Sequence, residues 1–453
     1  MLAQDAIEKL RSKQTRWVQL HFPDLYGVLR SRTVTSSSIN TLKFDSGFTF
    51  HDLSDTFNEV YEETFSLMPL ADTYGTLPWN DATDRFICSI KTSNKERYLK
   101  DVTYTVERAE QLFKAELKEL PSVKQSINFY MSDGSSIESS DARKSVEIPT
   151  KEAPWNHVAI RNQATLSHAS EPADSYSGIR QQIADVLTNF FNMSVFSHGH
   201  GRANNSQQVM TFDEMPAHMA AHALATLKMA ARAVGIVNVA IPTFMALPFA
   251  NDAPNDYKFS IASFVKGTNV FYDSDDELFL SQKARYFIGG ILEHARSLAF
   301  FTNPTVNSYK RLAISHKFTS AGKNDKYNAV LIHDATPTDY NFELTFPDPL
   351  ANPYFALASV LAAGVDGLKK KTEPNILKES PLILSEGQRR RKKVHDLPKT
   401  LIEAISELES DNDYLKGVFS TDIVYNYTEL KLQEFKDSQS MPSNFDYAAY
   451  FHL

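Results

Sequence analysis

One ten-residue segment, Asn-Pro-Thr-Val-Asn-Ser-Tyr-Lys-Arg-Leu at residues 303–312, constrains the fold of this chain more than any other feature. Four further segments accompany it along the chain. They are Phe-Pro-Asp-Leu-Tyr-Gly at residues 22–27, the stretch from Met-Pro-Leu-Ala-Asp-Thr to Leu-Pro-Trp at 68–79, Pro-Thr-Phe-Met-Ala-Leu-Pro at 242–248, and the run from Glu-Leu-Thr-Phe-Pro-Asp to Asn-Pro-Tyr and beyond at 343–358. Each segment is a weak signal by itself. Five of them in order, spread over nearly the whole length, restrict the fold strongly.

In this order the five segments resemble the landmarks of type I glutamine synthetases. The resemblance implies an α+β fold in which an N-terminal β-grasp domain, residues 1–97, precedes a larger domain, residues 98–453. The larger domain would be a β-barrel flanked by helices. The resemblance also implies a homo-oligomeric double ring of two stacked hexamers, a dodecamer with each site between neighbouring subunits. The loop around Asp45 and the segment 307–311 are expected to meet at that junction.

Length, charge and cysteine content restrict the protein class independently of any resemblance. With about 100 to 200 residues per domain, 453 residues indicate at least two domains. The formal net charge of -8 argues against nucleic acid as a partner. The single cysteine, Cys88, excludes an intramolecular disulfide and fits a reducing cytoplasm. No signal peptide and no uninterrupted apolar run of roughly 20 residues is found, so we expect a cytoplasmic protein without a membrane partner.

Hydrophobic periodicity predicts where helices and strands lie. Alternation predicts a hairpin with strands at 17–22 and 28–34, and a buried strand at 85–90. The segment 132–150, rich in Ser, Asp and Glu, predicts an exposed loop. Apolar residues at helical spacing predict helices at residues 101–118, 179–191, 217–234, 277–298, 353–368, 397–409 and 411–432.

Glutamine synthetases transfer the γ-phosphoryl group of ATP to the side chain of glutamate, and ammonia then displaces phosphate. This chemistry uses Mg²⁺ or Mn²⁺, which carboxylates and an occasional histidine bind. The resemblance assigns five metal-ligand positions, and these hold Ser126, Asn128, Gly201, Val209 and Phe259. None of the five side chains has a carboxylate or an imidazole. The sequence therefore predicts no metal site at these positions.

Four other positions of the family pattern are retained: Asp45, Asn307, Arg311 and Glu343. Glu343 is the one carboxylate left from the metal-ligand set, and a single carboxylate cannot hold two divalent cations against their hydration. Asn307 and Arg311 have two interpretations that the sequence leaves open. They either bind a residual ligand or form hydrogen bonds and ion pairs within the fold.

Basic groups expected at the site are also changed. Leu247 and Thr345 stand where the resemblance implies a lysine and an arginine, and Lys326 stands for a second arginine. Lysine cannot reproduce the bidentate fork of arginine. His218 and His222 are spaced four residues apart on a predicted helix and could share a metal, but no third ligand accompanies them, so a structural role is favoured.

These replacements lead to an expectation about function. We expect a glutamine synthetase homologue that has lost ATP-dependent ligase activity, uses no cofactor, and acts as a structural, regulatory or sensing oligomer, alone or with an active glutamine synthetase paralogue. Two alternatives remain: a divergent ligase that joins glutamate to ammonia or to another amine and uses ATP with Mg²⁺ or Mn²⁺, and a storage or filament-forming protein.

Overall fold

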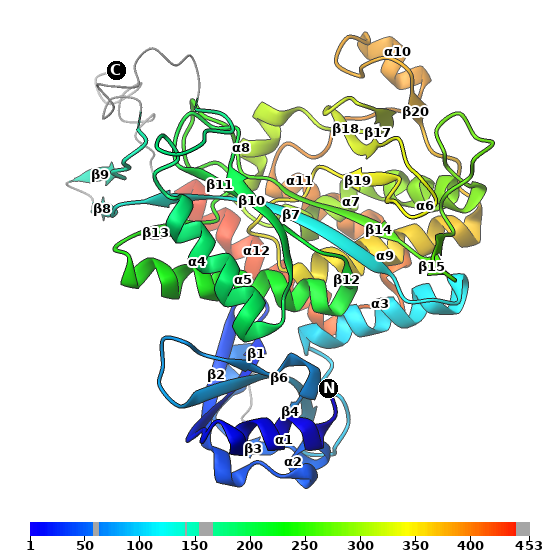
Figure 1. Cartoon of the computed structure of the whole chain (residues 1–453). Helices are drawn as coiled ribbons and strands as arrows, with labels where there is room; N and C mark the ends of the chain where they lie inside the picture. The colour runs from blue at the N-terminus through cyan, green and yellow to red at the C-terminus, as the bar shows by residue number, and fades with distance from the viewer. Residues whose placement is uncertain (58–62, 141–142, 154–165, 441–453) are drawn as a thin grey trace.

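Two β-sheets organise the computed structural model of the chain, a six-stranded sheet in the first hundred residues and a ten-stranded sheet in the rest (Figure 1). The structure describes residues 1–57, 63–140, 143–153 and 166–440. Helices cover both sheets, so the mixed α and β composition predicted from the sequence is confirmed.

The smaller sheet has the strand order β2-β1-β6-β4-β3, with β5 added beside β6. The predicted hairpin is present as an antiparallel pair, and its turn is fixed by Asp24, whose Oδ1 accepts from the backbone N–H groups of Tyr26 and Val28 at 2.9 and 3.0 Å. The predicted buried strand at 85–90 lies inside β6. The strands are β1 Trp17–Pro23, β2 Leu29–Thr35, β3 Phe48–Phe50, β4 Phe65–Pro69, β5 Gly75–Thr76 and β6 Thr83–Thr92, with helices α1 Ala3–Ser12 and α2 Thr41–Ser46 beside them.

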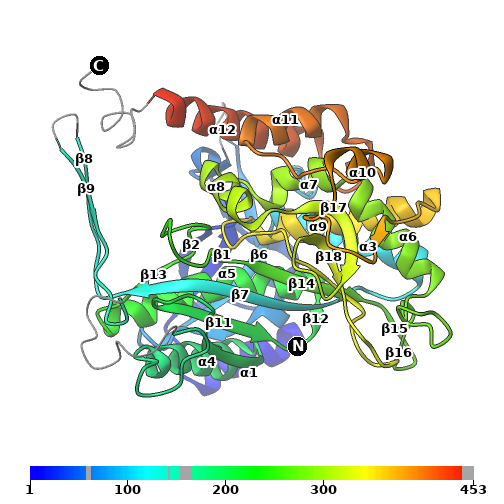
Figure 2. The same cartoon turned by 90° about the horizontal axis from the view of Figure 1, so that it is seen from above.

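The larger sheet has the strand order β10-β11-β7-β14-β19-β18-β17-β20, with β12 and β13 paired to β7. The long strand β7 lies at the centre of these pairings (Figure 2). The strands are β7 Ser122–Ser132, β10 Val195–His200, β11 Gln207–Phe212, β12 Met215–Pro216, β13 Ile241–Thr243, β14 Tyr257–Ala262, β17 Phe318–Lys323, β18 Asn328–Ile332, β19 Phe342–Leu344 and β20 Ile376–Leu377.

The helices of the larger part bury a wide apolar face against this sheet and against each other. They are α3 Val102–Leu117, α4 Ser177–Phe191, α5 Ala217–Val237, α6 Gln282–Glu293, α7 Ala295–Thr302, α8 Val306–Ser315, α9 Pro353–Lys370, α10 Glu386–Arg391, α11 Leu401–Ser410 and α12 Thr421–Ser440. The described residues also form short 3-10 helices, η1 Ser36–Ser38, η2 Ser54–Phe57, η3 Ala71–Thr73 and η4 Asp413–Leu415.

Helix α5 is the one described helix that is long and apolar enough to cross a membrane by length and composition. Of its apolar window, 67% is buried inside the protein, as is usual for a core helix. Its alanines allow this close packing, since Ala217, Ala220 and Ala221 are fully buried.

Two sequence predictions differ from the structure. The helix predicted at 277–298 is divided into α6 and α7 at His294, whose side chain bonds to acidic residues of two other elements. The loop predicted at 132–150 contains a hairpin of β8 Ser136–Ser139 and β9 Lys144–Glu147, although residues 141–142 lie outside the described residues. This hairpin projects from the body of the protein (Figure 2). A further short pair is β15 Phe264–Val265 with β16 Thr268–Asn269.

Candidate functional site

One face of the larger sheet carries the polar residues that the sequence singled out. Along β7, Ser126 and Asn128 are half-buried on this face, while the intervening Ile127 is 1% exposed and packs in the core. Directly opposite residues of paired strands share a face. Ser126 lies opposite Lys258 of β14, and Asn128 lies opposite Val209 of β11. The β-sheet register therefore brings Ser126, Asn128 and Val209 together.

The other two replaced positions lie differently. Phe259 is opposite Gln125 and Leu344 and is 1% exposed, so it faces the core rather than the polar face. Its neighbour Lys258 faces the polar side instead. Gly201 follows β10, and a Cβ at this position would overlap the side chain of Gln207, so the close approach of these two residues requires glycine.

Glu343 of β19 lies on the same face of the sheet as Lys258. Their Oε1 and Nζ atoms are 3.5 Å apart, and the two side chains are 21% and 34% exposed. Thr345, two residues further on, is buried, and its hydroxyl donates to the carbonyl oxygen of Asn328 at 2.8 Å. The retained carboxylate is therefore already paired with a cation of the chain.

Arg311 on α8 is fully buried, and each of its donors has an acceptor within the protein. The guanidinium donates to Asp256 Oδ1 at 2.6 Å, to the carbonyl oxygens of Asn255 and Phe346 at 2.8 Å, and more weakly to Asn303 Oδ1 and the carbonyl oxygen of Thr345. Of the two interpretations left open by the sequence, the structure supports the structural role for Arg311.

Asn307 on the same helix also has a structural role. Its Oδ1 accepts from the backbone N–H of Leu247 at 2.8 Å, and its Nδ2 donates to the carbonyl oxygen of Leu247 at 3.1 Å. Asp45 is exposed on α2, at the opposite end of the molecule from α8 (Figure 1). Within one chain, Asp45 is therefore not part of the polar face.

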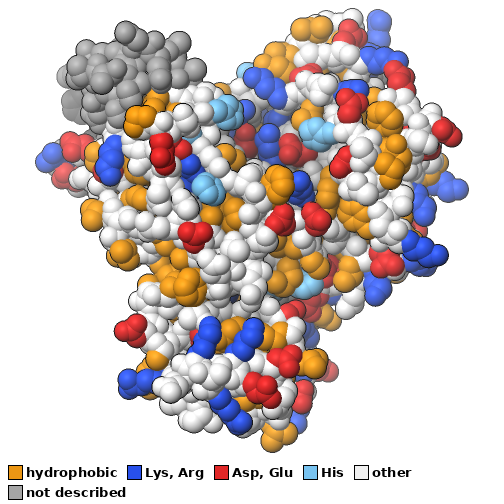
Figure 3. Space-filling model, viewed as in Figure 1, with side chains coloured by type: hydrophobic (Ala, Val, Ile, Leu, Met, Phe, Trp, Pro, Cys, Tyr) orange, Lys and Arg blue, Asp and Glu red, His pale blue; other side chains and the backbone are white. Residues whose placement is uncertain are grey.

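A cavity of about 280 Å³ opens beside this face. Five charged side chains line its wall, and these are Arg202, Asp256, Lys258, Lys317 and Lys326. Arg202 Nη2 pairs with Asp256 Oδ2 at 2.8 Å. In the space-filling view, acidic, basic and histidine side chains gather around a recess in the upper part of the molecule (Figure 3).

The charges of the cavity alter the ionisation of Asp256. Burial opposes ionisation of its carboxyl group, but Arg311, Arg202 and nearby lysines outweigh burial and lower the pKa of Asp256 to about 2. The carboxylate is therefore ionised throughout the neutral range.

The same surroundings disfavour the charged form of Lys317. Burial disfavours its charged form most. Asp256 attracts the charge and Arg311, Lys258 and Arg202 repel it, and together burial and repulsion lower the pKa of Lys317 to about 7. Its ammonium donates to the carbonyl oxygen of Lys326 and, at 2.6 Å, to Thr345 Oγ1. Lys317 is therefore a buried amine that changes charge near neutral pH.

A larger cavity of about 710 Å³ lies among the hairpin β1–β2, α5 and α12. Its walls are mainly apolar, with Trp79 and Phe244 among them. Lys228 reaches this wall, and burial lowers the pKa of Lys228 to about 8. Arg232, Lys431 and Glu434 also line this cavity. The smaller cavity is distinguished by its place, because Lys258 and Thr345 of the polar face line it.

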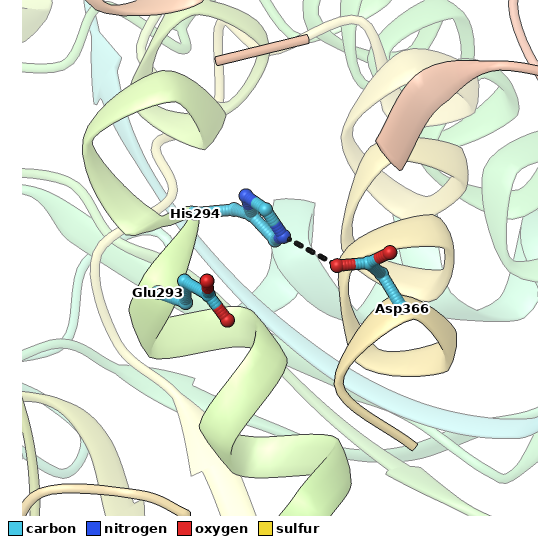
Figure 4. Close-up of side chains that lie close together, drawn as sticks. All are labelled: Glu293, His294 and Asp366. Carbon is cyan, nitrogen blue, oxygen red and sulfur yellow. Dashed lines mark hydrogen bonds and ion pairs between the residues drawn. The ribbon is translucent and has the colours of Figure 1, made fainter. Parts of the chain in front are cut away.

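Glu293, His294 and Asp366 are close enough together to suggest a metal site (Figure 4). Both ring nitrogens of His294 are occupied, however: Nε2 lies 2.9 Å from Asp366 and Nδ1 lies 2.8 Å from Asp411. Burial opposes protonation, but the hydrogen bonds to the two carboxylates prevail and raise the pKa of His294. Because both ring nitrogens already have carboxylate partners, neither is free for a metal, and the cluster is a network of hydrogen bonds and ion pairs.

His218 and His222 each bond to a residue of another helix. His218 Nδ1 lies 2.9 Å from both carboxylate oxygens of Glu110, and His222 Nδ1 lies 2.8 Å from the hydroxyl of Tyr354. Each histidine therefore joins α5 to a different helix, as the structural interpretation predicted.

Sequence inspection missed Arg202, Asp256, Lys258 and Lys317 as site residues. Lys258 had a signal, because it alternates with apolar Tyr257 and Phe259 in a strand pattern. Lys317 had none, since its contacts are with Lys326 and Thr345, which are 9 and 28 residues away.

Comparisons with known proteins agree along the whole chain. The sequence profile of the family described as "Glutamine synthetase, catalytic domain" matches residues 104–450. A glutamine synthetase of Sulfolobus acidocaldarius is 31% identical over 455 residues, covering 97% of this chain and 96% of that protein. One of Thermotoga maritima is 28% identical and covers 98% of each. A cryo-EM structure of Plasmodium falciparum glutamine synthetase superposes with a TM-score of 0.86 at 19% identity, covering 99% of each chain.

These findings overturn two expectations drawn from the five replaced positions. The inference of lost ligase activity is wrong, because proteins named glutamine synthetase match this chain over almost its full length. The expectation that no cofactor is used is wrong for the same reason. Both expectations equated the absent carboxylates with an absent site, whereas the structure places a cavity with charged side chains beside these positions.

Proposed function

Because the chain belongs to the glutamine synthetase family, we propose that it is a ligase of the glutamine synthetase type, which uses ATP to join a carboxylate to ammonia or to another amine. The observation that carries the proposal is the 31% identity over 97% of the chain. The polar face of the larger sheet and its cavity are the proposed site. The charged residues there suit substrates that carry phosphate and carboxylate groups.

A divalent cation would neutralise phosphate charge during such a transfer. The donor set beside the cavity does not fit a pair of protein-held cations. Of the carboxylates described there, Asp256 is engaged by Arg311 and Arg202, and Glu343 is paired with Lys258. Mg²⁺ is commonly held by substrate phosphates together with one or two carboxylates. Glu343 is the carboxylate whose position and partial exposure suit that contact.

Glu343, Lys258 and Lys317 have distinct proposed tasks. Lys258 and Lys317 place positive charge where a transferring phosphoryl group would carry negative charge. Glu343 orients Lys258 through their ion pair. Arg311 supports the site by fixing Asp256, which in turn pairs with Arg202.

The test is an assay of ATP turnover on the purified chain with Mg²⁺ or Mn²⁺. Glutamate is supplied with ammonia in one arm and with primary amines in the other, and both ADP and the amide product are measured. We expect ADP release that requires both the carboxylate and the amine, and the arm with the higher rate identifies the amine class. The Glu343→Ala variant should lose this turnover, whereas the exposed Glu409→Ala variant should keep it. Absence of substrate-dependent ADP release in every arm contradicts the ligase.

The domain boundaries, the location and the oligomeric assembly are also proposals. A β-grasp domain at residues 1–97, a barrel domain at 98–453 and a cytoplasmic location are inferred from the resemblance and composition. The homo-oligomeric double ring would bring the Asp45 loop of one subunit beside the cavity of the next. Mass photometry on dilute protein tests the ring, and a single monomeric species at physiological salt would count against it.

A further inference from the structure

We propose that the larger cavity, among the hairpin β1–β2, α5 and α12, binds a small apolar molecule through a single carboxylate that pairs with Lys228 and Arg232. The ligand class is a monocarboxylate whose body is an aliphatic chain or an aromatic ring. The larger cavity shares no lining residue with the smaller one, where the ligase site is proposed. The inference therefore goes beyond the proposed function, and it holds whether or not ligase turnover is found.

The larger cavity has the size and the place of a small-molecule site. Its volume of about 710 Å³ is within the roughly 300 to 1,000 Å³ of pockets that hold small ligands. Such pockets occur preferentially between domains. Here the turn of the hairpin, at Tyr26 and Gly27, faces α5 and α12 of the larger part. Figure 1 shows α5 directly above the hairpin.

Apolar side chains give the larger cavity a surface that suits a hydrocarbon body. Four aromatic residues line it, and these are Tyr26, Trp79, Phe244 and Tyr427. Ile236 and Val237 line it as well and are 79% and 75% exposed, so the cavity opens to solvent beside the end of α5. An apolar ligand would remove these surfaces from water, which is favourable by about 25 cal/mol for each Å² buried.

Two cations on the wall have no carboxylate bound to them. Lys228 and Arg232 are four residues apart on α5, so their side chains are neighbours on one face of the helix, and like charges at this spacing repel each other. Lys228 Nζ donates to the carbonyl oxygen of Ala351 at 3.3 Å. The side chain of Arg232 has no hydrogen bond or ion pair within the described part of the chain. A carboxylate between the two cations would offer one oxygen to each and would remove their repulsion.

The other two charges of the wall neutralise each other. Lys431 Nζ lies 2.8 Å from Glu434 Oε2 and about equally far from the ring centroids of Tyr26 and Tyr427, at 5.1 and 5.4 Å. The excess positive charge of the wall therefore belongs to Lys228 and Arg232. A multiply charged, strongly hydrated anion fits poorly beside Glu434 and the apolar rings, because it would lose hydration there. A single carboxylate on an apolar body fits both parts of the wall.

Lys228 keeps its charge at neutral pH. Burial lowers the pKa of Lys228 to about 8, the neighbouring Arg232 acts in the same direction, and Asp348 opposes both. The ammonium form therefore predominates at pH 7. Both cations are then available to a carboxylate.

The experiment is isothermal titration calorimetry of the full-length protein at pH 7 with sodium octanoate, and in a second arm with sodium 1-naphthoate. The uncharged analogue 1-octanol has the same apolar body as octanoate. We expect one saturable site for at least one carboxylate, with octanoate bound at least about tenfold more tightly than octanol if the aliphatic arm binds. The tighter of the two carboxylates identifies the body as a chain or a ring. No binding of either carboxylate, or octanol bound as tightly as octanoate, overturns the proposal.

Charge variants locate the carboxylate. Lys228→Met and Arg232→Gln should each weaken carboxylate binding roughly tenfold to a hundredfold, as expected for the loss of one charge-assisted contact. The matched control Lys114→Gln removes an exposed lysine of α3 and should leave affinity unchanged. If Lys228→Met does not fold, as judged by circular dichroism, the exposed Arg232 decides. Affinity equal to that of the wild type in both variants, or in Arg232→Gln alone when only that variant folds, overturns the assignment.

A third variant locates the apolar body. Ala233 lines the larger cavity, and the ring of Ala233→Phe would fill part of it. This variant should weaken the binding of the carboxylate and of octanol alike, and unchanged binding in the folded variant would place the ligand elsewhere and overturn the assignment.

A second copy of the chain is the competing occupant of the larger cavity. Titrations at two protein concentrations, with the oligomeric state measured by mass photometry, separate the two. Carboxylate affinity that is the same at both concentrations supports the small-molecule site. Binding that appears only when dilution separates the subunits would mean that a second copy fills the larger cavity, and it would overturn the proposal.

Discussion

Arg311 Nη2 lies 2.6 Å from Asp256 Oδ1 in a pair whose side chains are 0% and 7% exposed. Asp256 accepts in addition from Arg202, which reaches the cavity, so a buried arginine and a partly exposed one share one carboxylate. This arrangement explains why an arginine of the family pattern is retained here although its donors do not face the cavity. It fixes the carboxylate that in turn positions Arg202.

The Arg311→Lys variant should lose stability despite keeping the charge. Lysine offers a single ammonium where the fork of Arg311 meets acceptors on Asn255, Phe346 and Asp256, so these groups stay buried and unpaired. We expect a loss of about 3 to 5 kcal/mol in the free energy of unfolding, measured by urea titration.

The neighbouring exposed Lys310 provides the control for this substitution. Lys310→Gln lies on the same helix and should change the free energy of unfolding by less than about 0.5 kcal/mol. A loss below about 1 kcal/mol in Arg311→Lys would mean that the guanidinium bonds contribute little to the fold.

A second prediction concerns the packing of α6 on α9. Gly290 and Gly367 touch backbone to backbone, and a Cβ on Gly290 would overlap the carbonyl oxygen of Ala363 and the backbone of Gly367. Because neither helix backbone can give way without moving the other, Gly290→Ala should reduce the free energy of unfolding by about 1 to 3 kcal/mol or more.

Gly178 on α4 is the matched control, since no atom lies within 4 Å of a Cβ built there. Gly178→Ala should leave stability unchanged or raise it by up to about 1 kcal/mol, because alanine loses less backbone freedom on folding. The same sign of change in both variants would contradict the close-packing argument. Thermal unfolding followed by circular dichroism measures both.

Periodicity predicted most of the elements because the code for them is local. The hairpin β1–β2 and the helices α3, α4, α5 and α9 follow from alternation and helical spacing in the sequence. The break between α6 and α7 was not predictable in this way. It falls at His294, whose partners Asp366 and Asp411 are 72 and 117 residues away.

The site was less accessible to prediction than the fold. Inspection of ligand positions singled out Ser126, Asn128 and Val209 as side chains without a carboxylate or an imidazole, and strand pairing does place them together. Which lysines face the cavity depends on the register of β14 against β7, which places Lys258 rather than Phe259 on the polar face. A one-residue shift in register reverses every side chain, and a single sequence does not fix that register.

A third prediction uses the pH dependence of His294. Its pKa is raised in the folded state, so the stabilisation it provides is fully present below the unfolded pKa of about 6.5 and is lost as pH rises through the folded value. We compare His294→Gln with the wild type by urea titration at pH 6 and pH 9. The wild type should be more stable by about 1 to 3 kcal/mol at pH 6, and the difference should shrink at pH 9.

His51 supplies the control, because it is an exposed histidine directly after β3. His51→Gln should change the free energy of unfolding by less than about 0.5 kcal/mol. A difference between His294→Gln and the wild type that is equal at the two pH values would show that the ring contributes by packing on Tyr414 alone, at 4.2 Å between ring centroids, and not by its charge.

The last prediction concerns Arg85, a fully buried arginine on β6 that joins the smaller sheet to the larger part. Its Nη2 donates to Thr226 of α5 at 2.9 Å, and its guanidinium lies 4.5 Å from the ring centroid of Phe191 on α4. Its Nε and Nη1 have no acceptor in the part of the chain that the structure describes. Burial lowers the pKa of Arg85 to about 10, as expected for a cation held in apolar surroundings.

Two substitutions at Arg85 separate its volume from its charge. Arg85→Met keeps most of the volume and removes the unpaired donors, whose burial costs about 1 to 3 kcal/mol. This gain offsets the lost cation–π contact of about 0.5 to 2 kcal/mol, so the free energy of unfolding should change by less than about 1 kcal/mol. Arg85→Ala leaves a cavity between the two sheets and should reduce stability by about 2 to 5 kcal/mol. Urea titration of both variants measures these changes. If Arg85→Met is as unstable as Arg85→Ala, then the contacts of the Arg85 guanidinium with Phe191 and Thr226, rather than its packed volume, stabilise this junction.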